Sequence, residues 1–241
     1  MKIDKTSVVP IYFQLKTLIQ DRITSGEYPV GLCLPSEREY CDEYGISRMT
    51  VRQAIIDLVN EDFLRRERGK GTYVAQPKIE QKLQVLTSFT EEMKRRDMQP
   101  GTRLIHMAIC PATGHVASQL SLKEGELVYE IVRLRLADDE PMAIETAYLP
   151  IANLPNLTEE KVATGSLYEV MRESGLEIAH ATQTLEATLA KPTEATMLNI
   201  KNKGPVLLIE RTTYASGGQA IEFVKSVYRG DRYKFAIDLR S

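Results

Sequence analysis

Apolar residues between Pro10 and Ser25 recur every three or four positions, and this spacing predicts a helix with one buried face. Pro10 suits the first turn of that helix, where a missing backbone N–H costs nothing, and Gly26 ends it. Residues 27–35 contain two prolines and a glycine, which is typical of a loop. The chain is therefore expected to open with one amphipathic helix and a loop.

Two further helices are predicted next, with a glycine between them. Ser36 and Glu39 have the spacing of a capping box, which begins a short helix that Gly45 ends. Ser47 then caps a helix over residues 47–61. The buried face of this helix is expected to contain Val51, Ala54, Ile55, Leu58 and Val59. Two helices joined by a short break with glycine form the helix-turn-helix pattern.

Apolar and polar residues alternate in residues 63–65 and again in residues 72–74, on either side of Gly69 and Gly71. This alternation, with glycines at the turn, predicts a β-hairpin. The expected tip of the hairpin carries Arg66, Arg68 and Lys70. A helix-turn-helix followed by such a hairpin is a winged helix-turn-helix, which is a structure for holding DNA.

Total charge does not support DNA binding, but the distribution of charge does. Residues 1–76 contain eleven basic and eleven acidic side chains, whereas a nucleic-acid-binding domain is usually strongly basic. Residues 47–53 contain two arginines and no acid, and residues 65–72 contain four basic side chains and one acid. The basic side chains therefore concentrate on the predicted recognition helix and hairpin.

Arginines at the start of a recognition helix can read DNA sequence. A guanidinium donates two hydrogen bonds to O6 and N7 of guanine, which gives about 1 to 3 kcal/mol of discrimination per pair. Arg48 and Arg52 are placed for such contacts, while Thr50 is placed to meet a phosphate, which fixes register without reading bases. Taken alone, this helix also fits any amphipathic surface helix with two arginines.

The second half of the chain has a different pattern. Residues 76–84 are mostly polar and include Pro77, so we expect a linker there. Strands dominate afterwards, and short helices are expected near residues 88–96, 114–120, 166–174 and 193–200. The chain therefore divides into two expected domains, residues 1–75 and residues 85–241.

Two hairpins in the second half resemble each other. If the first turns about residue 139, Arg133 lies opposite Glu145 and Arg135 opposite Ala143, all on one face of the sheet. The second hairpin carries Arg211 and Glu222 at the matching positions, and Val224, Ser226 and Tyr228 follow Glu222 on one face.

Paired arginines on an apolar strand suit a phosphate or a carboxylate, because guanidinium groups offer paired donors to anionic oxygens. Glu145 and Glu222 suit sugar hydroxyls or an amide N–H. On local sequence alone, a simple cross-strand ion pair between Arg133 and Glu145 is an equally good interpretation.

The remaining composition narrows the class of protein. The 241 residues are 43% hydrophobic, but no apolar run approaches the roughly 20 residues that cross a bilayer, and no signal peptide is evident. We therefore expect a cytoplasmic protein. Three cysteines and three histidines are scattered without metal-ligand spacing, so neither a disulfide framework nor a metal site is expected, and no cofactor is indicated.

Three segments closely resemble the GntR family of bacterial transcription regulators, namely residues 34–39, 47–54 and 69–74. The resemblance implies that Arg38, Arg48 and Arg52 meet the major groove and that Gly69, with Lys70 beside it, brings the wing tip into the minor groove. Residues 85–241 are similar to the UTRA effector domain of the HutC subfamily. That resemblance implies an α+β protein with a winged helix-turn-helix and a chorismate-lyase-like, mainly antiparallel sheet with helices.

Within that subfamily, several UTRA segments are most similar to members that respond to amino-sugar phosphates. On this similarity the phosphate is held by Phe89, Thr90, Arg133, Arg135, Ser166 and Tyr168, and the sugar by Glu145, Glu222 and Tyr228.

We therefore expect a homodimeric repressor of carbohydrate uptake and catabolism genes that reads an inverted repeat in double-stranded DNA. Glucosamine 6-phosphate or N-acetylglucosamine 6-phosphate is expected to release it. The alternatives are the same class of regulator with a different phosphorylated sugar or small anion, and an enzyme of chorismate-lyase-like fold joined to a DNA-binding domain. No nucleophile, paired base or metal set stands out to support the enzyme.

Overall fold

The structure is a computed structural model that describes residues 3–239. The outermost residues of the two expected domains, 1–2 and 240–241, lie outside the described residues. The chain divides into two compact units, Met1–Lys78 and Ile79–Ser241. Each unit has its own buried apolar core, so each is described by itself.

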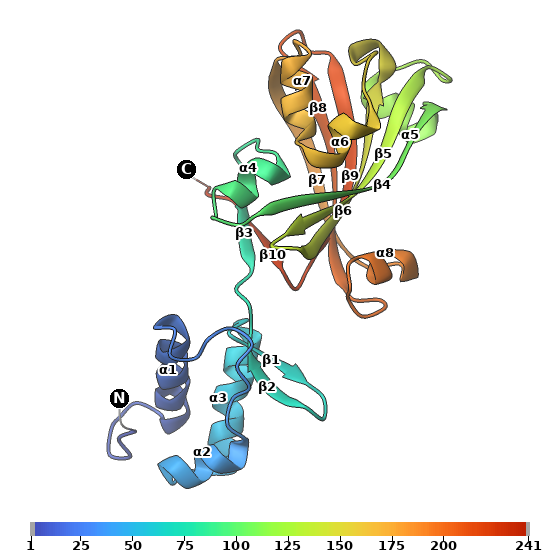
Figure 1. The fold of residues 1–241 in the computed structure, drawn as a ribbon. Helices are drawn as coiled ribbons and strands as arrows, with labels where there is room; N and C mark the ends of the chain where they lie inside the picture. Colours follow the sequence, from blue (N-terminus) through green and yellow to red (C-terminus); the bar gives the residue numbers. More distant parts are fainter. Residues whose placement is uncertain (1–2, 240–241) are drawn as a thin grey trace. The chain divides into compact units, whose positions relative to one another are not determined.

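The first unit packs three helices and a two-stranded antiparallel sheet around one core (Figure 1). Its elements are α1 (Ile11–Thr24), α2 (Glu37–Tyr44), α3 (Arg48–Asn60), β1 (Leu64–Glu67) and β2 (Gly71–Val74). The apolar faces of the helices meet in this core, which includes Leu15, Ile19, Val51, Ile55 and Leu58. The predicted winged helix-turn-helix is confirmed.

The capping predictions for α2 and α3 are confirmed atom by atom. The Ser36 hydroxyl accepts from the backbone N–H of Glu39, and the Glu39 carboxylate accepts from the backbone N–H of Ser36. Gly45 ends α2 with φ of 59°, a left-handed conformation that glycine adopts at little cost. Ser47 caps α3 by accepting from the N–H of Thr50.

The second unit is built on one six-stranded antiparallel sheet with strand order β4-β5-β6-β9-β8-β7. Its strands are β4 (Pro100–Pro111), β5 (Leu127–Ala137), β6 (Glu140–Pro150), β7 (Ile178–Leu189), β8 (Pro205–Ala215) and β9 (Ala220–Arg229). Arg133 pairs with Glu145 and Arg135 with Ala143, as predicted from a turn about residue 139. The predicted α+β class with a mainly antiparallel sheet is confirmed.

Short helices lie on both faces of this sheet (Figure 1). They are α4 (Phe89–Lys94), α5 (Gly114–Leu120), the 3₁₀ turn Ile151–Asn153, α6 (Glu159–Thr164), α7 (Leu167–Glu173) and α8 (Pro192–Met197). Helices α6 and α7 pack on the face that carries Tyr129 and Ile131, whereas α5 packs beside Val128 and α8 beside Leu134. The odd-numbered side chains of β5, including both arginines, therefore lie on the face of the sheet that α6 and α7 cover.

A small two-stranded sheet stands apart from the main one. The strand β3 (Ile79–Lys82) pairs in parallel with β10 (Tyr233–Ala236), near the end of the chain. The segment expected to be a linker, residues 76–84, is therefore partly a strand of the second unit.

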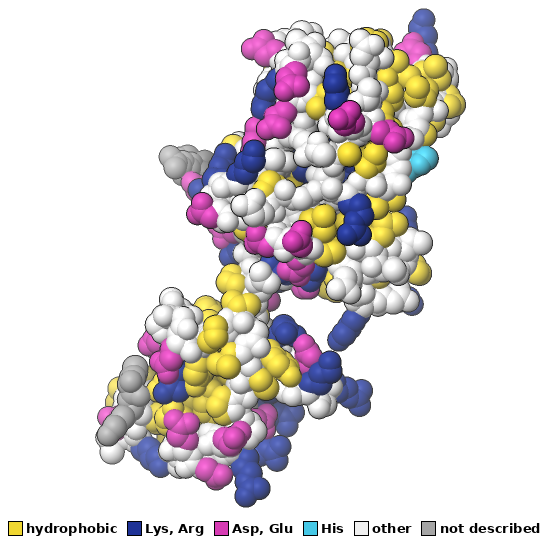
Figure 2. Space-filling view, in the orientation of Figure 1, with side chains coloured by type: hydrophobic (Ala, Val, Ile, Leu, Met, Phe, Trp, Pro, Cys, Tyr) yellow, Lys and Arg dark blue, Asp and Glu magenta, His cyan; other side chains and the backbone are white. Residues whose placement is uncertain are grey.

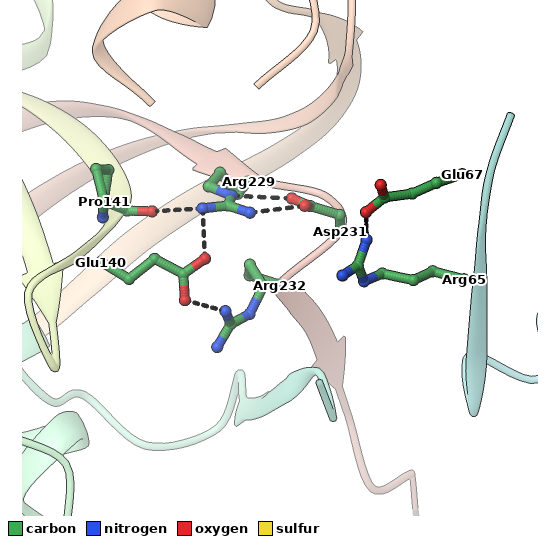
Figure 3. Close-up of polar contacts among 7 residues, drawn as sticks. All are labelled: Arg65, Glu67, Glu140, Pro141, Arg229, Asp231 and Arg232. Atoms are coloured by element: carbon green, nitrogen blue, oxygen red, sulfur yellow. Dashed lines mark hydrogen bonds and ion pairs between the residues drawn. The ribbon is translucent and has the colours of Figure 1, made fainter. Parts of the chain in front are cut away.

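A cluster of ion pairs around two buried arginines fixes the segment that leads into β10 (Figure 3). The Arg229 guanidinium donates to both carboxylate oxygens of Asp231, at 3.0 and 2.7 Å, and to Glu140 at 2.8 Å. Glu140 also accepts from Arg232, whose carbonyl accepts from the N–H of Ile79 at 2.7 Å. The start of β6 is thus tied to the start of the β3–β10 pair.

Within residues 3–239, no helix is both long enough and apolar enough to span a membrane. No group of three His, Cys, Asp or Glu side chains in the same range is arranged to hold a metal ion.

Candidate functional site

Exposed basic side chains gather on one side of the first unit, over α2, the start of α3 and the hairpin (Figure 2). The side chains of Arg38, Arg48 and Lys70 are 91%, 79% and 73% exposed. Arg52 is exposed on the same face of α3 as Arg48 and has no ion pair or hydrogen bond among the described residues. Four predicted contact residues are thus available to a ligand as large as DNA.

Contacts within the unit orient part of this surface. The Glu37 carboxylate lies 3.0 Å from Arg48 Nε on α3 and 3.4 Å from Arg66 Nη2 on β1. It therefore connects the first turn of α3 to the hairpin. Thr50 is half-buried, and its hydroxyl is 2.8 Å from that of Ser47. On the other side of β1, Arg65 pairs with Glu67 (Figure 3).

The hairpin tip is open to close approach. Gly69 has φ of 77°, and a Cβ atom added there would meet nothing within 4 Å. Glycine adopts that backbone conformation at little cost and, without a side chain, keeps the tip narrow. Lys70 follows it, and Nζ lies 3.5 Å from Glu67. The tip thus combines a narrow backbone with a cation, which suits entry into the minor groove.

The second unit contains a small, partly open cavity of about 40 Å³. Eight of the nine predicted effector residues line it, namely Phe89, Arg133, Arg135, Glu145, Ser166, Tyr168, Glu222 and Tyr228. Thr90 does not line the cavity, but its hydroxyl accepts a 2.9 Å hydrogen bond from Arg135 Nη2.

Arg135 is the most unusual group in the cavity. Its side chain is 2% exposed and stacks on the Phe89 ring, with the guanidinium carbon 4.8 Å from the ring centroid. Its Nη2 donates to Thr90, but its Nε and Nη1 have no hydrogen-bond partner among the described residues. Burial, and then the charge of Arg133, lower the pKa of Arg135 to about 10, so it stays charged at neutral pH. A buried cation with unused donors favours an anionic ligand.

Ser166 provides a second unused donor in the same cavity. It is 2% exposed, and its Oγ has no hydrogen-bond partner among the described residues. Buried hydroxyls are normally hydrogen-bonded, so this one is consistent with a ligand oxygen as its partner. Ser166 and Arg135 together offer both a neutral and a charged donor to one anion.

Arg133 is engaged differently from Arg135. It donates to Glu145 through Nε at 3.0 Å and through Nη2, while Nη1 donates to the Gly165 carbonyl at 3.2 Å. Burial opposes ionisation of Glu145, but the charges of Arg133 and then Arg135 hold its pKa below the ordinary value. The cross-strand ion pair exists, so Arg133 has fewer free donors than Arg135.

Glu222 lies in the same cavity without an arginine partner of this kind. It is 3% exposed, and Oε2 accepts from the Thr213 hydroxyl at 2.8 Å. The Thr213 hydroxyl is also 3.2 Å from the hydroxyl of Tyr168. Burial, and then the charge of Glu145, raise the pKa of Glu222 to about 7. Glu222 can therefore accept or donate a hydrogen bond near neutral pH.

This raised pKa predicts a pH-dependent stability. In the unfolded chain Glu222 loses its proton near its ordinary pKa of 4.5, but in the folded protein it keeps the proton up to about pH 7. Folding therefore takes up a proton in this window, and stability falls as the pH rises through it. Glu222→Gln removes the effect, so its Tm should exceed that of the wild type by several degrees at pH 8 and by little at pH 4.5.

The matched control for this measurement is Glu173→Gln, which removes an exposed carboxylate from α7. Its Tm should follow the wild type at every pH. A Glu222→Gln variant whose Tm differs from the wild type equally at pH 4.5 and pH 8 would contradict a raised pKa for Glu222.

Several cavity residues were not predicted as ligand contacts. Arg211 lines the cavity and donates from Nε to Gln183 at 2.8 Å, and the hairpin repeat that matches it to Arg133 could have indicated it. Gln81 on β3 also lines the cavity, together with Thr87 and Ser88. The sequence around these three polar residues does not indicate that they are buried. The first strand after residue 78 therefore contributes directly to the cavity wall.

Comparisons with known families cover both units. Residues 11–74 match the family described as bacterial regulatory proteins, gntR family, and residues 95–234 match the UTRA domain.

Full-length relatives and a solved structure agree with these matches. The HTH-type transcriptional repressor NagR of Bacillus subtilis is 46% identical over 98% of this chain and 97% of its own length. The mannosyl-D-glycerate transport/metabolism system repressor MngR of Escherichia coli is 28% identical over 95% of each chain. The crystal structure of PhnF from Mycobacterium smegmatis superposes with a TM-score of 0.70 at 31% identity, covering 93% of this chain and 98% of that one.

Proposed function

Because the chain belongs to the gntR family of bacterial regulatory proteins and carries a UTRA domain, we propose that it represses amino-sugar uptake and catabolism genes until an amino-sugar phosphate binds. As a transcriptional repressor of this family, it binds operator DNA and responds to a small-molecule effector.

The unused donors of Arg135 and Ser166 carry the proposal. A phosphate group would accept from Arg135 Nε or Nη1 and from Ser166 Oγ, which have no other partner among the described residues. The carboxylates of Glu145 and Glu222 line the same cavity, and an amino sugar would present hydroxyls with an ammonium or amide N–H to them. One ligand with an anionic end and a donor-rich ring therefore matches both sets of groups.

In the proposal, residues 1–75 bind the operator and residues 85–241 bind the effector in a cytoplasmic homodimer. Operator contacts are assigned to Arg38, Arg48, Thr50, Arg52, Gly69 and Lys70. Two copies related by a twofold axis would read an inverted repeat. Gln81 lies on β3 and also lines the cavity. A bound effector would therefore shift the conformational equilibrium of β3, the strand that follows the DNA-binding unit.

Fluorescence anisotropy with a labelled operator duplex tests the proposal. An effector shifts a conformational population only if it binds one state more tightly than the other. Millimolar glucosamine 6-phosphate or N-acetylglucosamine 6-phosphate is expected to favour the state that does not fit the operator and to weaken operator binding at least tenfold. Free glucosamine and inorganic phosphate serve as controls for the two ends of the ligand and should have much weaker effects.

The outcome also separates the alternatives. If neither amino-sugar phosphate changes affinity and another sugar phosphate or small anion does, the effector assignment is wrong while the anion site stands. Turnover of a sugar phosphate or of chorismate by the purified protein would instead support the enzyme.

A further inference from the structure

The first turn of α3 carries an apolar side chain that the fold does not use. Met49 is 72% exposed, the highest value for a large hydrophobic residue within any helix or strand of residues 3–239. The next residue, Thr50, is half-buried, and Val51 is fully buried in the core. Met49 therefore contributes little to the stability of the unit.

Met49 lies among exposed polar and basic side chains on α3. Arg52 and Gln53 follow it by three and four residues, which places them on the same side of α3, and both are exposed. Arg48 precedes it and is oriented by Glu37. An apolar group between two arginines at the start of a recognition helix would meet base edges when that helix lies in the major groove.

We infer that Met49 reads a thymine by packing against its C5 methyl group. Among the four base edges in the major groove, thymine alone presents an apolar group, whereas guanine presents the two acceptors that suit the arginines. Met49 is flexible and polarisable, so it can adjust to a methyl group without a preformed pocket. The two residue types on this helix face would then specify different base pairs.

A methyl-deletion experiment tests this inference with effector-free, full-length protein, so it does not depend on the identity of the effector. A duplex is first selected from a random pool with the wild-type protein. Each thymine is then replaced in turn by deoxyuridine, which removes only the C5 methyl group. The dissociation constants of the wild type and Met49→Ala are measured by fluorescence anisotropy at one fixed salt concentration.

One thymine position in each half-site is expected to show coupling. Removing its methyl group should weaken binding of the wild type about fourfold, the equivalent of exposing one methylene-sized group. The same change should weaken binding of Met49→Ala to the duplex less than twofold, because this variant lacks the side chain that contacts the methyl group. Met49→Leu should keep most of the discrimination.

Val30→Ala is the matched control, because it removes an exposed apolar side chain, 55% accessible, from the loop between α1 and α2. It should bind every duplex like the wild type. The Tm of Met49→Ala should equal that of the wild type, since Met49 is not part of the core. Equal losses in the wild type and Met49→Ala at every thymine, or no loss at any thymine, would overturn the inference.

Discussion

Replacing Arg135 with methionine is expected to abolish stabilisation by amino-sugar phosphates while raising the Tm of the ligand-free protein. Arg135 is a buried cation whose Nε and Nη1 have no partner among the described residues, so the folded protein loses their hydration without compensation. Methionine has a similar length and removes that cost. It also removes the proposed phosphate donors, which should weaken effector binding by a factor of about 100 or more.

Thermal shift with increasing glucosamine 6-phosphate measures both effects, because a ligand raises the Tm with the logarithm of its concentration. Operator binding without effector should stay at the wild-type level, and the operator should no longer be released by the sugar phosphate. Arg103→Met is the control, since Arg103 is an exposed arginine on β4. If Arg135→Met responds to the effector like the wild type, the anion site lies elsewhere.

Replacing both Arg48 and Arg52 with alanine is expected to weaken operator binding at least 100-fold and to leave effector binding intact. Each arginine is exposed at the start of α3 and can form a bidentate pair with guanine, about 1 to 3 kcal/mol per contact, in each subunit of a dimer. The first 76 residues have no net charge, so little nonspecific attraction to DNA remains to compensate the loss.

Anisotropy and thermal shift on the same preparation separate the two activities. Arg95→Ala, which removes an exposed arginine from the second unit, controls for the general loss of positive charge. Loss of effector binding in Arg48→Ala/Arg52→Ala would mean that operator binding and effector binding do not belong to separate units as proposed. Unchanged operator binding would place recognition on another surface.

Features set by neighbouring residues could be predicted from the sequence. The cap of α2 depends on Ser36 and Glu39, three residues apart, and both of its hydrogen bonds are present. The pairing of Arg133 with Glu145 depends on a tight turn at residues 138–139, both of which have positive φ. In each case the residues in contact are no more than about a dozen positions apart in the sequence, so their spacing limits how they can meet.

Features that depend on distant segments could not be predicted. Nothing in the polar segment Ile79–Lys82 indicates that it pairs with Tyr233–Ala236 or that Gln81 faces a cavity. In the second hairpin, Glu222 lies opposite Thr213, and Arg211 lies opposite Val224 instead of Glu222. The raised pKa of Glu222 therefore follows from a register that its sequence repeat with the first hairpin does not reveal.

The pairing of β3 with β10 also determines when β3 can form its sheet during synthesis. The DNA-binding unit ends at Lys78, and domains near the N-terminus fold first as a chain leaves the ribosome. At about 5 to 20 residues per second, residues 79–236 take roughly 8 to 30 s to make. Until Tyr233–Ala236 emerges, β3 lacks its partner strand, so the segment that follows the DNA-binding unit stays unpaired during this interval.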